Sequence, residues 1–391
     1  MSATIAVVCI LTFLHYVGAQ MRGPVLSLYA ATHGATATGV GLIIGAHMAA
    51  AGAGSLPLGR ASDVWGRRPL MLAGLILSAA TSLMLPLVEH ELALMAVYGL
   101  AGLGVAAFTP AALSMVGDAA PRGQVGHAYA WYSTAHYGAI AVGPFLGGLV
   151  AEWAGYRTAF VASAVAITAA LVVAHRLLRG AAAQVTGHTG ATFAEVRRDP
   201  TVWAGWLAAI SGLFIQGVVF PFFPLLANER GLGPAAIGVV FLTLGLTNTL
   251  ARFPAGWLID RTRRASLYSV GGLIVASIAT ALLTRAPSYT STLVLVAIIG
   301  TASGIAFVGI SVGLAASSTP ATRGVVMGGY STSLYLGFAL GSFALGPLIT
   351  RHGYDVAFLW GGAVGAAGTL ASAILWAIKG VAGAPTAPRS P

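Results

Sequence analysis

The chain contains 391 residues, of which 57% are hydrophobic and only 8% are charged, and its mean hydropathy is +0.85. Because a soluble domain carries roughly 25% charged residues, this composition excludes an ordinary soluble domain and predicts an integral membrane protein. The formal net charge of +10 does not indicate a nucleic-acid partner, since the basic residues stand in short segments between apolar runs. Cys9 is the single cysteine, so no disulfide can form within the chain.

Twelve apolar runs are long enough to cross a bilayer, for which a helix needs about 20 residues. The first six cover roughly residues 4–31, 39–59, 69–88, 92–116, 124–150 and 156–178, and the last six cover roughly 201–228, 235–257, 265–284, 290–316, 324–350 and 355–379. The first run is too long for the core of a signal peptide and lacks a basic segment before it, so we interpret it as a retained helix. The sequence therefore predicts an all-α integral membrane fold of twelve transmembrane helices.

The two halves of the chain repeat one another at a spacing of 197 to 198 residues. Matching pairs include Tyr132 with Tyr330, Gly143 with Gly341, Gly155 with Gly353, and Phe160 with Phe358. A repeat this long in so apolar a chain predicts two homologous six-helix bundles, at residues 1–178 and 201–379. Residues 179–200 are too few for a domain and are predicted to be a cytoplasmic linker, and the Ala/Pro/Gly-rich residues 380–391 are predicted to be a disordered tail.

The distribution of Lys and Arg predicts the orientation in the membrane. With the N-terminus in the cytoplasm, four of the twenty basic residues lie outside, two lie within spans, and the other fourteen lie inside. Those outside are Arg157, Arg230, Arg285 and Arg351, and those within spans are Arg22 and Arg252. By the positive-inside rule, both termini are predicted to be cytoplasmic, in a multi-pass protein of the inner membrane.

Two short basic segments, 59–69 and 256–264, follow the second and the eighth apolar run. The first contains Gly59, Asp63, Gly66, Arg67 and Arg68. The second is one residue shorter, and it keeps Gly256, Asp260, Arg263 and Arg264 but has Thr262 where the glycine would stand. The first segment resembles the Gly-x-x-x-Asp-x-x-Gly-Arg-Arg signature of the major facilitator superfamily, and the resemblance covers essentially the whole chain.

This resemblance implies a gate on the cytoplasmic side. Asp63 would lie near the N-terminus of the eleventh helix, where its charge meets the positive end of a helix dipole. Arg67 would pair with Asp118, at the cytoplasmic end of the fourth helix. The expected gate also includes Gly59, Gly66, Arg68 and Asp260. The alternative interpretation is that the arginines only fix the topology and that Asp118 caps a turn before Pro121.

The fifth apolar run carries a small-residue pattern made of Gly143, Pro144, Gly147 and Gly148. It resembles the motif of the twelve-helix drug:proton antiporter branch, and this resemblance implies export. Ordinary close packing of helices is the alternative, because small residues are common in membrane helices. The chain departs from that branch at 98–104, where the arginine and glutamine usual on the fourth helix are absent.

All ten carboxylates fall in loops or at the ends of spans, so the polar groups near the midplane are basic or neutral. The candidates for substrate binding are His15, Gln20, Arg22, His47, Tyr132, His136, Gln216 and Asn248. Arg22 would suit an anionic or carbonyl-bearing ligand, although it could equally bond helix-end carbonyls or reach the surface. Histidines are the only plausible proton sites, and His15 is the best placed, the alternative being packed, satisfied histidines. Arg252 lies closer to the cytoplasmic surface and is interpreted as structural.

The sequence thus predicts a secondary active transporter that moves a small organic solute by alternating access, with export favoured and protons as a candidate coupling ion. An importer, symporter or facilitator of a small, possibly anionic metabolite is the alternative. We expect no enzyme activity, cofactor or metal, because no metal-ligand or nucleophile–base motif occurs, and no Gly-x-x-x-x-Gly-Lys loop would let ATP drive transport. The expected partners are the substrate, protons and membrane lipid, with no nucleic acid, and the expected functional form is a monomer.

Overall fold

The computed structural model describes residues 2–121, 124–178, 196–319 and 322–382, and throughout these residues the secondary structure is helical. Eleven of the described helices are long and apolar enough to cross a membrane. Those of the first half are α1 (Ala3–Thr32), α2 (Ala37–Trp65), α3 (Arg67–Met84), α4 (Glu91–Ala119), α5 (Val125–Ala154) and α6 (Tyr156–Leu177). Those of the second half are α8 (Pro200–Glu229), α9 (Pro234–Thr262), α10 (Ala265–Leu282), α11 (Tyr289–Ser317) and α12 (Arg323–Ala382).

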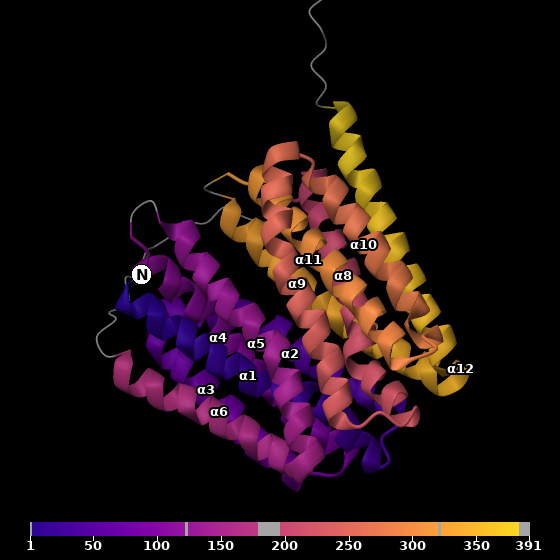
Figure 1. The fold of residues 1–391 in the computed structure, drawn as a ribbon. Coiled ribbons are helices and arrows are strands. Elements are labelled where there is room, and N and C mark those ends of the chain that lie inside the picture. The colour runs from indigo at the N-terminus through magenta and orange to yellow at the C-terminus, as the bar shows by residue number, and fades with distance from the viewer. Residues whose placement is uncertain (1, 122–123, 179–195, 320–321, 383–391) are drawn as a thin grey trace, which may run out of the picture.

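Helix α12 accounts for two of the twelve predicted spans. Its 60 residues would extend about 90 Å at 1.5 Å per residue, about three times the apolar thickness of a bilayer. At Gly353 the backbone leaves the helical region, with φ 80° and ψ 173°, and Figure 1 shows the chain reversing direction there. The predicted all-α membrane fold is therefore confirmed. Most of the predicted linker and of the predicted tail lies outside the described residues.

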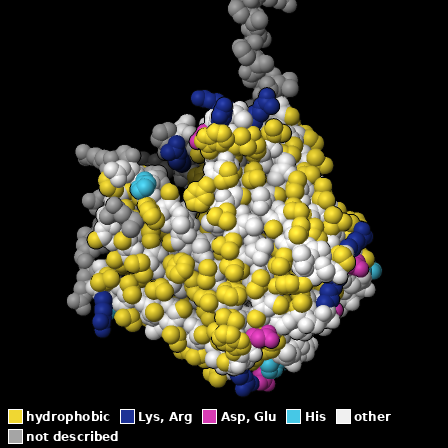
Figure 2. Space-filling view, viewed as in Figure 1, with side chains coloured by type: hydrophobic (Ala, Val, Ile, Leu, Met, Phe, Trp, Pro, Cys, Tyr) yellow, Lys and Arg dark blue, Asp and Glu magenta, His cyan; other side chains and the backbone are white. Residues whose placement is uncertain are grey.

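The outer surface suits a lipid solvent. Figure 2 shows apolar side chains over most of the visible face, with charged side chains gathered toward its edges. Large apolar side chains that face outward include Val165 of α6, Ile278 of α10 and Ile374 of α12, all more than half exposed. In water these side chains would form an aggregation-prone patch, so their exposure indicates that hydrocarbon covers them.

The backbone repeats at the same spacing as the sequence. Positive φ angles occur at three pairs of positions, namely Gly34 and Gly231 (86° and 82°), Gly66 and Arg263 (96° and 54°), and Gly155 and Gly353 (85° and 80°). These pairs correct the alignment of the two basic segments. At a constant offset of 197 residues, Arg263 and not Thr262 takes the place of Gly66, and the second segment needs no deletion.

The two bundles meet closely at one end only. We call the end that carries residues 59–69 the signature end, and the opposite end the far end. In the half toward the far end, a methyl group built on Gly245 of α9 would lie 2.5 Å from the Cα of Ala141 in α5. One built on Gly346 of α12 would lie 2.9 Å from the Cα of Thr38 in α2. Glycine is therefore needed at both positions, because the two backbones nearly touch.

Toward the signature end these approaches are lost. Among the described residues, nothing lies within 4 Å of a methyl group built on Gly256 of α9, or on Gly324 or Gly328 of α12. Figure 1 shows the two bundles arranged as a V whose arms separate toward this end. The structure is thus closed at the far end and open at the signature end.

Candidate functional site

The signature segment forms a three-residue ionic network inside the first bundle. Arg67 begins α3, and its Nη1 lies 2.6 Å from Oδ1 of Asp63 in α2, while its Nε lies 2.5 Å from Oδ2 of Asp118 in α4. Gly66 joins α2 to α3 with φ 96° and ψ 150°, a conformation that favours glycine. The expected contact between Arg67 and Asp118 is therefore present, and the network ties the signature ends of three helices together.

The other described residues of the expected gate make no hydrogen bond or ion pair from one bundle to the other. Asp63 keeps 60% of its side chain exposed, and the interaction that the described structure gives it is the one with Arg67. Arg68 donates from Nη2 to the backbone oxygen of His175, 3.3 Å away, and so ties α3 to α6 in the same bundle. Asp260 is exposed at the end of α9. Since the arms are apart at this end, the gating role of these residues stays a prediction.

The Gly143–Gly148 motif of α5 is a close-packing surface on two sides. A methyl group on Gly143 would meet the Cβ of Gln20 at 2.6 Å, and one on Gly147 would collide with the backbone of Met21, both in α1. One on Gly148 would collide with the backbone of Pro234 in α9 of the other bundle. The motif therefore lets α5 contact its own bundle and the opposite bundle together at the far end.

Three of the predicted binding residues lie inside the first bundle in this conformation. Arg22 is completely buried, and its Nη1 donates to the backbone oxygen of Ser78 and to Oγ1 of Thr81, each 3.4 Å away in α3. His47 stacks on Tyr98 with ring centroids 4.3 Å apart. His15 is also fully buried, 4.4 Å from the ring of Phe108. These positions fit the structural interpretation of Arg22 better than contact with a ligand between the bundles.

A set of polar and aromatic side chains, separate from Arg22, His47 and His15, lies where the two bundles begin to separate. We call this set the interface cluster. Its members are Tyr16 of α1, Tyr132, His136 and Tyr137 of α5, Asn248 and Arg252 of α9, and Tyr330 and Tyr335 of the first part of α12. The cluster therefore draws on both bundles, and it contains Tyr132, His136 and Asn248 from the predicted binding set.

Aromatic contacts organise the first-bundle half of the cluster. His136 packs edge-on against Tyr16, with ring centroids 4.1 Å apart. It also stacks parallel to Tyr132 at 6.1 Å and contacts Tyr137 at 5.1 Å. The hydroxyl of Tyr16 shares a hydrogen bond of 2.6 Å with Thr109 of α4. Several rings thus surround the imidazole of His136.

Arg252, which the sequence interpretation treated as structural, supplies the second-bundle half of the cluster. Its guanidinium carbon lies 3.7 Å from the ring centroid of Tyr137, so the contact crosses from one bundle to the other. Its Nε donates to Oδ1 of Asn248, one turn earlier in α9, at 3.1 Å. Tyr330 and His136 both lie within Coulombic range of its charge. An Asn and an Arg four residues apart in an apolar run were the signal for this site.

The cluster contains buried hydrogen-bonding atoms that lack a partner among the described residues. One is Nδ1 of His136, and the hydroxyl of Tyr132 has beside it only the hydroxyl of Thr12, without a well-formed hydrogen bond between them. Buried polar atoms are rarely left unpaired, because each one lost from water without a partner costs about 1–3 kcal/mol. These two atoms therefore call for a further polar group, either from water or from a ligand. Gln20 and Gln216 are half-buried on α1 and α8, and the structure does not add them to the cluster.

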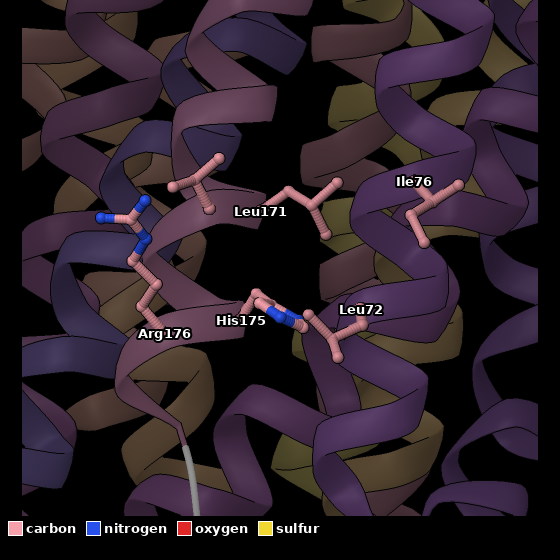
Figure 3. Close-up of a pocket in the computed structure, with 6 residues that line it drawn as sticks. Leu72, Ile76, Leu171, His175 and Arg176 are labelled. Carbon is pink, nitrogen blue, oxygen red and sulfur yellow. The ribbon is translucent and has the colours of Figure 1, made fainter.

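Two surface hollows lie away from the interface between the bundles. One, of about 410 Å³, is lined by Leu72 and Ile76 of α3 and by Leu171, Val172, His175 and Arg176 of α6. Figure 3 shows its apolar side chains pointing into the space between these helices, while the guanidinium of Arg176 points away from it. The other, of about 560 Å³, lies on α10 and α11. Both are on flanks where lipid would lie, so neither is the candidate site.

Comparison with known families agrees with this architecture. Residues 8–341 and 205–390 match the sequence model of the Major Facilitator Superfamily. The chain belongs to this superfamily.

Two curated relatives match most of the chain. An uncharacterised transporter of Methanocaldococcus jannaschii is 23% identical over 88% of this chain and 90% of its own. A chloramphenicol resistance protein of Pseudomonas aeruginosa is 25% identical over 90% of this chain and 83% of its own. Among solved structures, a bacterial homologue of the human lysosomal transporter Spinster superposes with a TM-score of 0.79 at 16% identity, covering 96% of both chains.

Membership of the Major Facilitator Superfamily makes the chain a multi-pass membrane transporter. The fold and the family are those of transporters and not of enzymes. In this context the interface cluster is the candidate place for a small molecule, because both bundles contribute to it and it borders the open half of the molecule.

Proposed function

We propose that this chain is a secondary transporter that moves a small organic solute by alternating access, in the direction of export. The observation that carries the proposal is the position of the interface cluster. It lies between the closed half, where Gly245 meets Ala141, and the open half, where Gly256 meets nothing within 4 Å among the described residues. A solute bound there would reach one end of the molecule only, and exchange of the open and closed halves would present it to the other.

The charge pattern supports an orientation in the membrane. The signature end carries most of the basic residues, so the positive-inside rule assigns it to the cytoplasm. In this assignment the conformation faces inward, and the far end faces out. Two threonines help to close the far end, because Oγ1 of Thr38 and Oγ1 of Thr350 lie 3.0 Å apart across the two bundles.

Export and proton coupling rest on separate support. The Gly143–Gly148 motif occupies the closed interface, and the relative from Pseudomonas aeruginosa is named for resistance to chloramphenicol, which favours the outward direction. For coupling, His136 is the one imidazole in the interface cluster, and histidine is the side chain whose ordinary pKa lies nearest neutrality. It replaces His15 as the proposed proton site, since His15 is enclosed within one bundle. Because the described carboxylates lie at the helix ends, a facilitator without a coupling ion is the alternative.

The test locks the far end shut. In a variant in which Cys9 is replaced by Ser, Thr38→Cys and Thr350→Cys should form a disulfide under oxidation. Inside-out vesicles are screened for accumulation of chloramphenicol, benzoate, benzamide and benzylamine, with and without a proton gradient. Oxidation should abolish accumulation in the double variant and leave each single variant active, and a reductant should restore it. Full transport by the cross-linked protein would contradict alternating access, and transport only in the opposite direction would contradict export.

A further inference from the structure

Arg252 is a membrane-embedded cation whose described surroundings contain no carboxylate. A charge inside a membrane protein is costly and is normally met by an opposite charge or by several acceptors. The ion pairs of the described residues are His33 with Glu89, Arg157 with Glu89, and Arg67 with Asp63 and Asp118, all at the ends of the helices. The charge of Arg252 is therefore not neutralised by these residues.

The hydrogen bonds of Arg252 are also incomplete. A guanidinium has five N–H donors, and the described structure uses the one on Nε, toward Asn248. The face of the guanidinium lies on Tyr137, which leaves its edge, with the Nη1 and Nη2 donors, available. This edge is the part of arginine that binds a carboxylate through two parallel hydrogen bonds.

The other intramembrane arginine shows what a structural arginine looks like in this chain. Arg22 is completely enclosed in one bundle, where its Nε and Nη1 donate to oxygens of Ala19, Ser78 and Thr81 and only Nη2 has no partner among the described residues. Arg252 instead is only half-buried, contacts the opposite bundle, and stands at the border of the open half. Arg252 is therefore placed so that its Nη1 and Nη2 donors could bind a ligand between the bundles.

The surroundings of Arg252 indicate what else the ligand carries. Nδ1 of His136 is buried and unpartnered, and the hydroxyl of Tyr132 has only an imperfect contact with Thr12, so both can bond further polar atoms of a ligand. The rings of Tyr16, His136 and Tyr137 offer flat apolar faces. A cation would meet repulsion from Arg252, and a purely apolar solute would leave these polar atoms unpaired.

We propose that Arg252 and Asn248 anchor the anionic group of the substrate, and that the substrate is a small organic acid whose planar body packs among the rings of the interface cluster. This assignment rests on the proposed function, because it takes the interface cluster as the place where the solute binds. It gives the site a substrate class, and it assigns recognition to a residue outside the predicted binding set.

The test compares three molecules of one shape. Benzoate, benzamide and benzylamine share a ring and differ in charge, and their binding to the purified protein is measured by thermal shift and by isothermal titration. Benzoate should bind at least about tenfold more tightly than benzamide, the difference expected for one charge-assisted hydrogen bond, and benzylamine should bind least. Equal binding of all three, preference for the amine, or no binding of benzoate up to 10 mM would overturn the proposal.

Variants then test whether Arg252 is the source of the preference for benzoate over benzamide. Arg252→Gln should reduce the preference for benzoate over benzamide to about one, and Arg252→Lys, which keeps the charge but loses the planar fork, should retain part of it. Arg285→Gln removes the same charge from an exposed position at the far end and should retain all of it. An unchanged preference in a folded Arg252→Gln protein would overturn the assignment to Arg252. The binding measurement is independent of the cross-linking test, so either can fail while the other stands.

Discussion

Glu152, in the last turn of α5, accepts a hydrogen bond from the backbone N–H of Ala235, in the first turn of α9 (Oε2 to N 3.3 Å). The bond crosses from one bundle to the other at the far end. The N-cap residue of α9 is Gly233, which has no side chain to cap the helix, so the opposite bundle supplies the cap. The repeat contains a counterpart, since Thr350 lies 198 residues after Glu152 and accepts from the backbone N–H of Thr38 in α2, also at 3.3 Å.

The first prediction concerns this cap. Glu152→Gln removes a negative charge from the positive end of the α9 dipole, which is worth about 1 kcal/mol, so the open-to-closed ratio at the far end should rise about fivefold. The readout is the distance between spin labels at Trp131→Cys of α5 and Leu250→Cys of α9, in a protein with Cys9 replaced by Ser. A larger population with these labels close together is expected.

Glu229→Gln is the matched control for this variant. Glu229 lies at the same end and accepts a hydrogen bond of 2.9 Å from the hydroxyl of Tyr354, within the second bundle. Its replacement should leave the distance distribution unchanged. If both variants shift the distribution equally, the effect is one of surface charge and the cap across the interface has no special role.

The second prediction concerns the signature network. Asp63→Asn removes one exposed ion pair with Arg67, so it should lower the free energy of unfolding by less than about 1 kcal/mol. Transport should nevertheless fall at least tenfold, because the predicted partner of Asp63 is the N-terminus of the eleventh span, which it would meet only when the signature ends close. Thermal unfolding and vesicle transport are compared at equal membrane abundance. Normal transport in this variant would show that the segment fixes topology only.

The third prediction concerns the backbone at Arg263. This residue has φ 54° and ψ 27°, a left-handed conformation that costs a non-glycine residue roughly 1 kcal/mol. Arg263→Gly should therefore raise the free energy of unfolding slightly, by up to about 1 kcal/mol, as measured by thermal unfolding. Arg264→Gly removes the same charge one residue later, where φ is −110°, and should give no such gain. A loss of stability in Arg263→Gly alone would mean that its side chain matters more than its backbone.

The fourth prediction separates the two intramembrane arginines. Arg22→Ala removes a fully buried side chain and its bonds to α3, so it should lower the free energy of unfolding by about 2 kcal/mol or more. The preference for benzoate over benzamide should persist in the folded fraction. Calorimetry gives the free energy of unfolding, and titration of the same preparation gives the ratio of benzoate to benzamide affinity. Loss of the preference with unchanged stability would return Arg22 to the binding site, where the sequence had placed it.

Hydropathy was a good guide to where helices occur in this chain and a poor guide to which way they face. The ends of the predicted spans agree with those of the observed helices to within six residues, apart from the two spans that α12 joins, because a run of apolar residues long enough to cross a bilayer has few alternatives. The contact between Arg67 and Asp118 could also be anticipated, because the resemblance to the superfamily signature implied that Arg67 pairs with Asp118 at the end of the fourth helix.

The rotation of each helix could not be anticipated in the same way. In a soluble helix the apolar face marks the core, but in α8 apolar residues lie on every face, so the sequence contains no such mark there. Arg22 was a candidate for ligand binding, with bonds to helix-end carbonyls as the equal alternative, and it lies within one bundle. Arg252 was interpreted as structural, and it contacts the opposite bundle. One residue of helix rotation moves a side chain by about 100°, which decides whether it faces its own bundle or the other one.

The single-residue turns at Gly155 and Gly353 have a mechanical consequence. Helix α5 ends at Ala154 and α6 begins at Tyr156. Only one residue therefore connects α5, which contacts the opposite bundle, to α6, which lies on the lipid-facing side. The same is true of the two parts of α12 on either side of Gly353. Any tilt of the inner helix is therefore transmitted to its outer neighbour, which changes the outline that the protein presents to the bilayer. We expect the thickness of the surrounding membrane, through hydrophobic mismatch, to act as a thermodynamic variable in the equilibrium between the inward-open and outward-open states.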